Sequence, residues 1–256
     1  MLRRLVTLRS SSLGLSAAPA LIIAPHPDDE ALGAGGLIAM KRAVGAPVTV
    51  AYLTCGEASH ADCCDIDRRQ VAEARRALSA EATKLLGVPA ADLRWLGLKD
   101  GAIPRRGQVG FQEAALQLAK LIGQLRPAEI YAPHRLDRRI DHEAACELAG
   151  HAATLAGGQT RLFYYLVWGW FRLRLSAAAA LLRCRVFRLD VQTALARKRA
   201  AIDHYFSRSA PSCGKPYCGV LPEGFVQWLS GRWEFFWLPR GQRPAQDGRS
   251  TRRPPP

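Results

Sequence analysis

The sequence lacks any apolar run long enough to cross a membrane, and its cysteines show no disulfide framework. A membrane-spanning helix needs roughly 18 or more apolar residues, and no unbroken segment of that length occurs among the 256 residues. The seven cysteines are odd in number and irregularly spaced, which favours reduced thiols. The arginine- and serine-rich N-terminus lacks the apolar core of a signal peptide. We therefore expect a cytoplasmic protein without a transmembrane segment.

Acidic residues are scarce at both ends of the chain. The first sixteen residues carry three arginines and no acid, and residues 239–256 carry five arginines and one aspartate. These two ends supply half of the net charge of +14. Because such ends are usually disordered and solvated, we predict disordered extensions at residues 1–17 and 239–256. No recognised nucleic-acid-binding motif accompanies the charge, so we expect no specific nucleic-acid partner.

Between these ends, strand-like and helix-like segments alternate. This order is typical of a doubly wound, mostly parallel sheet flanked by helices, and we predict one Rossmann-like α/β domain over residues 18–238. The predicted strands are residues 20–24, 47–53, 93–96, 129–132, 161–167, 184–189 and 231–238, the last at an edge of the sheet. The predicted helices are residues 30–44, 66–86, 111–125, 141–155 and 191–205, with a helical turn between residues 167 and 184.

A histidine and three consecutive carboxylates follow the first predicted strand. The apolar residues 20–24 precede His26, Asp28, Asp29 and Glu30, and a helix rich in small residues comes next. Sheets of this class place ligands at the carboxyl ends of their strands. Clustering one imidazole and three acids there is costly unless a cation or solvent compensates the charge. Since a helix N-cap requires only one acid, we predict a metal site and, with it, a hydrolytic enzyme.

A second polar cluster, residues 133–143, follows the fourth predicted strand. In a doubly wound sheet the first and fourth strands can lie side by side at the switch point, which would bring His142 close to His26 and Asp29. Two imidazoles, one carboxylate and an open fourth position suit catalytic zinc. Asp28 adjoins Asp29 but projects differently, so it can remain unligated and hold a metal-bound water.

Residues 24–30, with the sequence APHPDDE, resemble the signature of the PIG-L/LmbE family of zinc-dependent deacetylases. Further similarities are TCGEAS at 54–59, LGLKDG at 96–101, DH at 141–142 and KRAAI at 198–202. The resemblance covers roughly residues 20–207. That family removes acetyl or related acyl groups from N-acetylglucosamine-type amines. The resemblance therefore implies its fold, a zinc ion and N-deacetylase activity.

Carried over by position, the resemblance implies that His26, Asp29 and His142 bind zinc and that Asp28 is the general base. The family usually has a histidine three residues before the last ligand, where this chain has Arg139. Arginine can stabilise an oxyanion together with zinc, but it stays ionised and cannot donate a proton at ordinary pH. Asp28 would then accept the proton of the attacking water and return it to the leaving amine.

Several polar and aromatic residues allow more than one interpretation. His134 could swing into the site in place of the missing histidine, or activity could be reduced. Asp100 and Arg69 are candidates to bind sugar hydroxyls, although Arg68 is nearly as suitable as Arg69. A solvated helix face would explain either arginine.

Two further features have both a functional and an ordinary structural explanation. His60, Cys63 and Cys64 could suggest a second zinc site, but their spacing fits structural zinc sites poorly, and unpaired thiols are the better interpretation. The aromatic run at residues 164–171 could stack on a sugar, pack in the core, or form a contact between copies in a homo-oligomer.

The sequence therefore predicts a zinc-dependent hydrolase that removes an N-acetyl or related acyl group from an amino sugar or glycoconjugate. Two alternatives stay open. One is an amidase that acts on a non-sugar N-acyl amine with the same site. The other is a catalytically weak or silent sugar-binding protein of the same fold, an alternative that Arg139 keeps open.

Overall fold

The computed structural model describes residues 2–60, 65–158, 160–172, 184–206 and 222–240. The strands are β1 (Ser11–Ser12), β2 (Ala20–Ala24), β3 (Val48–Tyr52), β4 (Leu93–Trp95), β5 (Glu129–Pro133), β6 (Arg161–Tyr165), β7 (Arg185–Asp190) and β8 (Trp233–Leu238). The α-helices are α1 (Leu2–Arg9), α2 (Asp29–Ala43), α3 (Arg68–Leu85), α4 (Phe111–Leu125), α5 (Ile140–Leu155), α6 (Gly169–Arg172), α8 (Leu195–Phe206) and α9 (Phe225–Leu229). Short 3-10 turns are η1 (Ala90–Asp92), η2 (Arg135–Asp137) and η3 (Gln192–Ala194).

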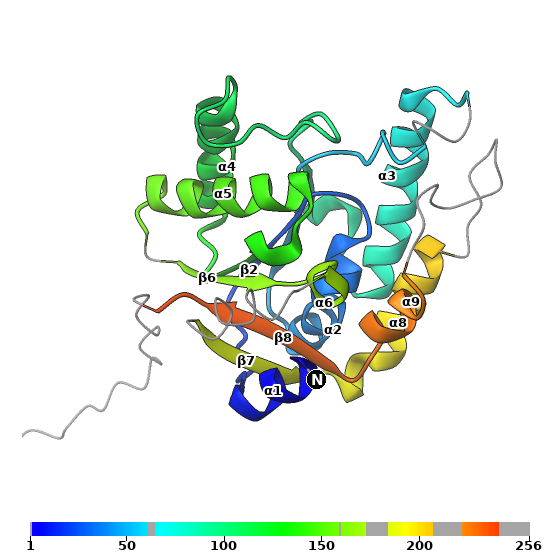
Figure 1. Ribbon diagram of the computed structural model, residues 1–256, viewed down its shortest axis with the longest axis vertical. Coiled ribbons are helices and arrows are strands. Elements are labelled where there is room, and N and C mark those ends of the chain that lie inside the picture. The colour runs from blue at the N-terminus through cyan, green and yellow to red at the C-terminus, as the bar shows by residue number, and fades with distance from the viewer. Residues whose placement is uncertain (1, 61–64, 159, 173–183, 207–221, 241–256) are drawn as a thin grey trace, which may run out of the picture.

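The strands form one sheet in the order β1-β7-β8-β6-β5-β2-β3-β4, and Figure 1 shows β7, β8 and β6 side by side. Strands β4, β3, β2, β5 and β6 are parallel neighbours, and β1 pairs in parallel with β7. The predicted α/β class with a mostly parallel, doubly wound sheet is confirmed. As expected, β2 and β5 lie side by side, with Ala20 opposite Glu129 and Ile22 opposite Tyr131.

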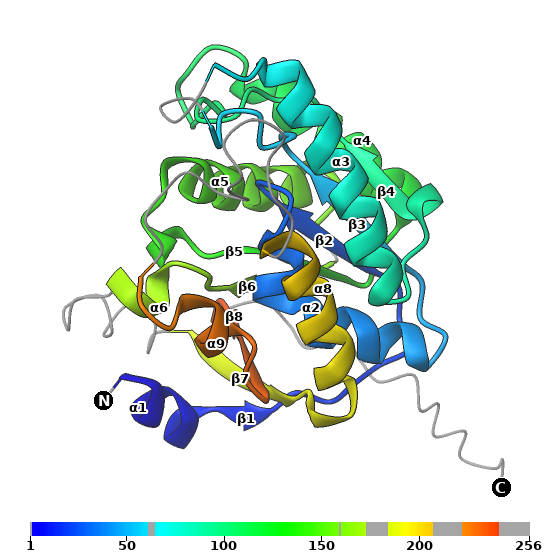
Figure 2. The ribbon, with the colours of Figure 1, turned by 90° about the vertical axis from the view of Figure 1, so that its right-hand side faces the viewer.

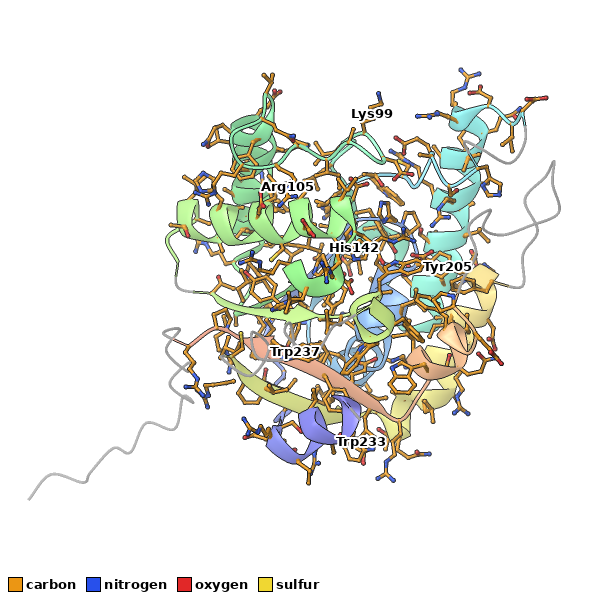
Figure 3. All side chains as sticks on the ribbon, viewed as in Figure 1. Lys99, Arg105, His142, Tyr205, Trp233 and Trp237 are labelled. Carbon is orange, nitrogen blue, oxygen red and sulfur yellow. The ribbon has the colours of Figure 1, made fainter. Side chains whose placement is uncertain are left out.

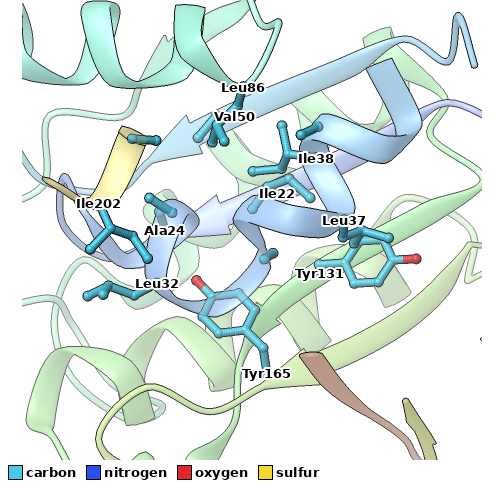
Figure 4. Close-up of a cluster of buried hydrophobic side chains, with 14 of the residues drawn as sticks. Ile22, Ala24, Leu32, Leu37, Ile38, Val50, Leu86, Tyr131, Tyr165 and Ile202 are labelled. Carbon is cyan, nitrogen blue, oxygen red and sulfur yellow. The ribbon is translucent and has the colours of Figure 1, made fainter. Parts of the chain in front are cut away.

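The core fills both faces of the sheet, and β2 lies between the two halves. Leu21 and Ile23 contribute to a cluster with α4 and α5, whereas Ala20, Ile22 and Ala24 contribute to a cluster with α2 and α8. Successive side chains of a strand point to opposite faces, which explains this alternation. Figure 2 shows these helices around the strands, and Figure 4 shows β2 packed beside α2.

The prediction that residues 231–238 form an edge strand was wrong. β8 lies inside the sheet and pairs antiparallel with both β6 and β7. Its residues from Glu234 to Leu238 are all buried. An uninterrupted buried run of this kind is what a strand covered on both faces shows, so the aromatic pattern indicated an interior position.

The N-terminal segment also differs from the expected disordered extension at residues 1–17. Residues 2–9 form α1, and β1 pairs with β7 through Ser11 and Phe187. Val6 is buried in a cluster with Leu166 and Trp237, which gives this basic segment an apolar anchor. The predicted tail lies outside the described residues from position 241 onward. Of the predicted helical turn between residues 167 and 184, α6 is described and residues 173–183 lie outside the described part.

None of the helices in the described ranges has the length and hydrophobicity that crossing a bilayer requires.

Helix α2 packs so closely against its neighbours that two of its glycines leave no room for a side chain. A Cβ atom at Gly36 would lie 2.4 Å from Cγ1 of Val191, and one at Gly33 would lie 2.3 Å from the ring of Tyr165. By contrast, a Cβ at Gly123 of α4 would meet nothing within 4 Å. The glycines of α2 thus allow the close packing of the helix that begins at Asp29.

Replacing Gly36 with alanine should lower the free energy of unfolding by about 1–3 kcal/mol, because the added methyl group overpacks the contact with Val191. The matched change Gly123→Ala should be neutral or stabilising by up to about 1 kcal/mol, because alanine has the higher helix propensity. Denaturant unfolding of both variants measures the difference. Equal stability changes in the two variants would contradict the packing argument.

Candidate metal centre and active-site cavity

Two loops meet where the neighbouring strands β2 and β5 end. His26 and Asp28 lie between β2 and α2, and Asp29 is the first residue of α2. Asp137 ends η2 after β5, and His142 lies in the first turn of α5. Because β2 and β5 run in parallel, both loops emerge at the same edge of the sheet.

The three residues predicted as metal ligands are brought together. Oδ2 of Asp29 lies 3.2 Å from Nδ1 of His26 and 3.3 Å from Nε2 of His142. One ligand-type atom from each of these residues lies within 4.8 Å of the other two. Asp29 and His142 are only 2% and 1% exposed, while His26 is partly exposed and lines a cavity.

Asp137 orients His142. Its buried carboxylate lies 2.6 Å from Nδ1 of His142 and also accepts hydrogen bonds from the backbone N–H groups of Val167 and Gly169. A carboxylate that holds one imidazole nitrogen as N–H leaves the other nitrogen free to bind a metal. Nε2 of His142, which faces Oδ2 of Asp29, is therefore the nitrogen available to a metal ion. Sequence reasoning missed this role of Asp137, although the residue belongs to the polar cluster after β5.

His26 is oriented in the same manner from its other side. Nε2 of His26 lies 3.0 Å from Oδ1 of Asp100 and 3.0 Å from Oδ2 of Asp141. The Asp141 carboxylate also accepts hydrogen bonds from the N–H groups of Gly101 and Ile103. A proton on Nε2 leaves Nδ1 of His26 directed at the predicted ligand set. The carboxylates of Asp100 and Asp141 also form a second group of ligand-type atoms with His26.

The electrostatics of the site favour a cation. Burial alone would lower the pKa of His142, but the carboxylates of Asp29 and Asp137 raise it to about 9. Burial alone would raise the pKa of the Asp29 carboxyl, but His142 and His26 lower it. The imidazoles therefore sit in a strongly negative potential. Two nitrogen donors and one carboxylate in such a potential fit a divalent metal ion.

Asp28 stands beside the ligands with an unusual backbone. Its φ of 114° lies where non-glycine residues are rare, and such strain concentrates at functional sites. Oδ2 of Asp28 lies 3.1 Å from Nη2 of Arg75, which also donates to the carbonyl of Pro27. Burial raises the pKa of Asp28 to about 6, although Arg75 opposes this shift. The carboxyl group is thus suited to exchange a proton near neutral pH.

Sequence reasoning also missed Arg75. A Cβ at Gly56 would lie 2.3 Å from Nε of Arg75, so the absence of a side chain at Gly56 gives the guanidinium its path to Asp28. Gly56 also has a φ of +69°, a conformation that favours glycine. Gly56 in the TCGEAS segment at residues 54–59 thus pointed to a close approach of another side chain. The sequence did not show that this side chain is Arg75 of α3.

Arg139 and Trp168 form one wall of the cavity. The guanidinium carbon of Arg139 lies 3.9 Å from the centre of the Trp168 ring, which is a cation–π contact. The cavity has a volume of ≈ 490 Å³. Besides the predicted ligands and the residues of this wall, its lining includes Asp28, Ser59, Arg75, Asp100, Arg138, Ile140 and Asp141.

The two predicted sugar-binding residues differ in position. Asp100 lines the cavity and contacts His26. Arg69 does not line it: its side chain is 82% exposed and lies 4.0 Å from Asp67. Arg68, the alternative, is also exposed. Both arginines lie in the first turn of α3, and Arg75, further along the same helix, reaches the site instead.

The remaining candidates lie away from the predicted ligands or outside the described residues. Burial and the charge of Arg135 lower the pKa of His134 to about 4, and its Nδ1 accepts a hydrogen bond from Leu136. The buried His134 is absent from the cavity lining. Nδ1 of His60 lies 3.0 Å from Oγ of Ser59, while Cys63 and Cys64 lie outside the described residues. Of the aromatic run at residues 164–171, Trp168 lines the cavity and the others mainly pack in the core.

Known proteins share sequence segments with this chain. The family model described as PIG-L, GlcNAc-PI de-N-acetylase, matches residues 21–153, more than half of the chain. The probable N-acetyl-alpha-D-glucosaminyl L-malate deacetylase 2 of Bacillus subtilis is 40% identical over 82 residues, which cover 31% of this chain and 36% of that protein. The 1D-myo-inositol 2-acetamido-2-deoxy-alpha-D-glucopyranoside deacetylase of Saccharomonospora viridis is 30% identical over 166 residues, which cover 56% of this chain and 61% of that protein. The matches thus span less than two thirds of either relative.

Solved structures share the fold at lower identity. The N,N'-diacetylchitobiose deacetylase of Pyrococcus horikoshii is 20% identical with a TM-score of 0.58, over 79% of this chain and 75% of that one. GalB, the 4-carboxy-2-hydroxymuconate hydratase of Pseudomonas putida, is 18% identical with a TM-score of 0.64, over 90% of this chain and 99% of that one. Because a deacetylase and a hydratase share this fold, the fold alone does not select the reaction.

Replacing Asp137 with asparagine should weaken the binding of a divalent metal by about 10–100-fold, because the variant loses the charge that orients His142. Calorimetric titration of Zn²⁺ into metal-free protein measures the affinity, and circular dichroism confirms the fold. The control Glu113→Gln, at an exposed position of α4, should leave the affinity unchanged. A folded Asp137→Asn variant with the affinity of the wild type would show that Asp137 does not orient the ligand.

Proposed function

The chain belongs to the PIG-L family, and from this premise we propose that it is a metal-dependent N-deacetylase of an acylated amino sugar or glycoconjugate. One observation carries the proposal. Ligand-type atoms of His26, Asp29 and His142 lie within 4.8 Å of one another beside a cavity of ≈ 490 Å³, and Asp28 lines the same cavity. The two relatives named above are deacetylases of glucosamine conjugates, which supports this substrate class.

Zinc is the metal that we propose. His26, Asp29 and His142 would hold it, since two imidazoles and one carboxylate are typical of catalytic zinc sites that keep one position open. When bound, such an ion supplies Lewis acidity, which polarises a carbonyl group and makes water more acidic. Asp137, Asp100 and Asp141 would keep the two imidazoles in the tautomers that metal binding requires.

Asp28 is the proposed general base. Its carboxylate accepts the proton of the water that attacks the acyl carbonyl carbon, and the same proton is then delivered to the nitrogen as the C–N bond breaks. The products are a carboxylic acid and a free amine. Arg75 contacts the Oδ2 atom of Asp28 and so holds the carboxylate at the cavity wall. Both proton transfers fall to Asp28 because Arg139 stays ionised.

Arg139 is the proposed stabiliser of the oxyanion. Its guanidinium lines the cavity, and the stack on Trp168 limits its movement. A fixed positive charge beside developing negative charge lowers the barrier because little reorganisation is needed. Among the polar residues that line the cavity, Ser59 and Arg138 are better placed than Arg69 to contact hydroxyl groups of a substrate.

Two expectations stay predictions: a cytoplasmic location and the absence of a specific nucleic-acid partner. A homo-oligomer stays one possible state of assembly. The two alternatives, a non-sugar amidase and a silent sugar-binding protein, are separated from the proposal by the experiments that follow.

Replacing Asp28 with asparagine should lower kcat by about 10²–10⁴-fold, because the amide cannot accept the proton, while the zinc content stays that of the wild type. Replacing His142 with alanine should remove both zinc and activity. Release of free amine from a panel of N-acetylated amino sugars and simple N-acyl amines measures activity, and elemental analysis measures zinc. The exposed acid Asp203 on α8 provides the control Asp203→Asn.

Each arm of this experiment has a distinct outcome. Amine release from sugars alone supports the proposed substrate class, whereas release only from simple N-acyl amines supports the non-sugar amidase. A wild-type protein that holds zinc but releases no amine from any compound would overturn the deacetylase and favour the binding protein.

The pH profile tests Arg139. Asp28 must be ionised to accept a proton, so the activity of the wild type should fall as the pH drops through about 6. The variant Arg139→His should be more active at low pH, because imidazolium can donate a proton, and should lose this advantage as the pH rises through about 6.5.

The control Arg139→Met removes the charge and should lower kcat at every pH. If neither variant changes kcat at any pH, Arg139 takes no part in the reaction.

A further inference from the structure

A buried chain of hydrogen bonds joins helix α8 to the backbone of Asp28. The hydroxyl of Tyr205 donates to Oε1 of Glu30 at 2.7 Å. The other oxygen, Oε2, accepts a hydrogen bond from the backbone N–H of Asp28 at 3.1 Å. Glu30 is fully buried and Tyr205 nearly so. Two side chains therefore connect the C-terminal part of the fold to the proposed general base. Figure 3 labels Tyr205, which lies on α8.

The backbone of Asp28 needs such support. With φ at 114° and ψ at −30°, Asp28 is the N-cap of α2, yet its side chain makes no capping hydrogen bond. The carboxylate is instead free to contact Arg75 at the cavity wall. A strained conformation persists only where its surroundings hold it. The hydrogen bond from the Asp28 N–H to Glu30 is one such restraint.

Glu30 can restrain Asp28 only if its own carboxylate is fixed. One oxygen is engaged by Asp28 and the other by Tyr205, so rotation of the carboxylate breaks both bonds. The hydroxyl of Tyr52 lies 3.4 Å from the hydroxyl of Tyr205. Tyr205 does not line the cavity. Its hydroxyl therefore acts on the site from outside the cavity, and the hydrogen bond to Glu30 is the link toward Asp28.

We propose that Tyr205 is a positioning residue for deacetylation: its hydroxyl fixes Glu30, which holds Asp28 in the conformation that directs the general base into the cavity. The inference rests on the proposed function for the role of Asp28. The link between Tyr205 and the Asp28 backbone is independent of that function and can be measured separately.

The test compares two buried tyrosines that donate to a buried glutamate. Tyr205→Phe keeps the ring and removes only the hydroxyl. Tyr131→Phe is the matched control, because the hydroxyl of Tyr131 donates to Oε2 of Glu129 at 3.0 Å. Glu129 is the first residue of β5, at the amino ends of the parallel strands and thus at the opposite edge from the metal centre. Both variants lose one buried hydrogen bond, and both should lose similar thermal stability.

Only Tyr205→Phe should alter the reaction. We expect kcat to fall by about 3–10-fold, as loss of one hydrogen bond in the positioning chain implies, with KM within about twofold and zinc content unchanged. In a Glu30→Ala background the same change should have less than about a twofold further effect, because the restraint is already absent. The control Tyr131→Phe should leave kcat unchanged both in the wild-type protein and in the Glu30→Ala background. Wild-type kcat in Tyr205→Phe, or full additivity with Glu30→Ala, would overturn the proposal.

Amide hydrogen exchange provides a readout that does not depend on activity. NMR should show the Asp28 N–H exchanging about 10-fold faster or more in Tyr205→Phe and at the wild-type rate in Tyr131→Phe. Unchanged exchange in Tyr205→Phe would overturn the proposed restraint even if Glu30→Ala does not fold. If the wild-type protein releases no amine, the proposed function fails, while faster exchange would still establish that Tyr205 holds Asp28.

Discussion

The parallel pairing of β2 with β5 is the constraint on which the metal centre depends. Residues more than a hundred positions apart meet because both strands deliver their following loops to one edge of the sheet. His26 and Asp29 come from one loop, and Asp137 and His142 from the other. Small residues on α2 then let the helix that begins at Asp29 pack closely on the core. Without this pairing, neither loop holds a complete ligand set.

Burying several carboxylates at this edge is costly, and the structure compensates each of them. Asp137 and Asp141 accept backbone N–H groups while they contact the imidazoles, and Asp28 is held by Arg75. An isolated buried charge would be expensive. The same contacts orient the two imidazoles and raise the pKa of His142. The contacts that compensate the buried charges are therefore the same contacts that prepare the site for a cation.

The part of the chain beyond the matched family segment also supports the site. Trp168 stacks on Arg139, and Tyr205 connects α8 through Glu30 to the backbone of Asp28. Both aromatic residues lie after residue 153, where the family match ends. An arginine in place of the usual histidine leaves Asp28 as the single proton carrier of the proposed reaction, so the restraint on its backbone has added importance.

The fold class, the candidate ligands and the family could be predicted from the sequence alone, because alternating apolar segments and a dense local motif do not depend on distant contacts. Only the tertiary structure decided which distant side chains complete the site. Arg75 rather than Arg69 reaches Asp28, Asp137 and Asp141 hold the imidazoles, and β8 enters the sheet instead of lying at its edge. Local periodicity reports how each segment is buried, but pairing between strands and helices far apart in the chain depends on packing, which no single segment encodes.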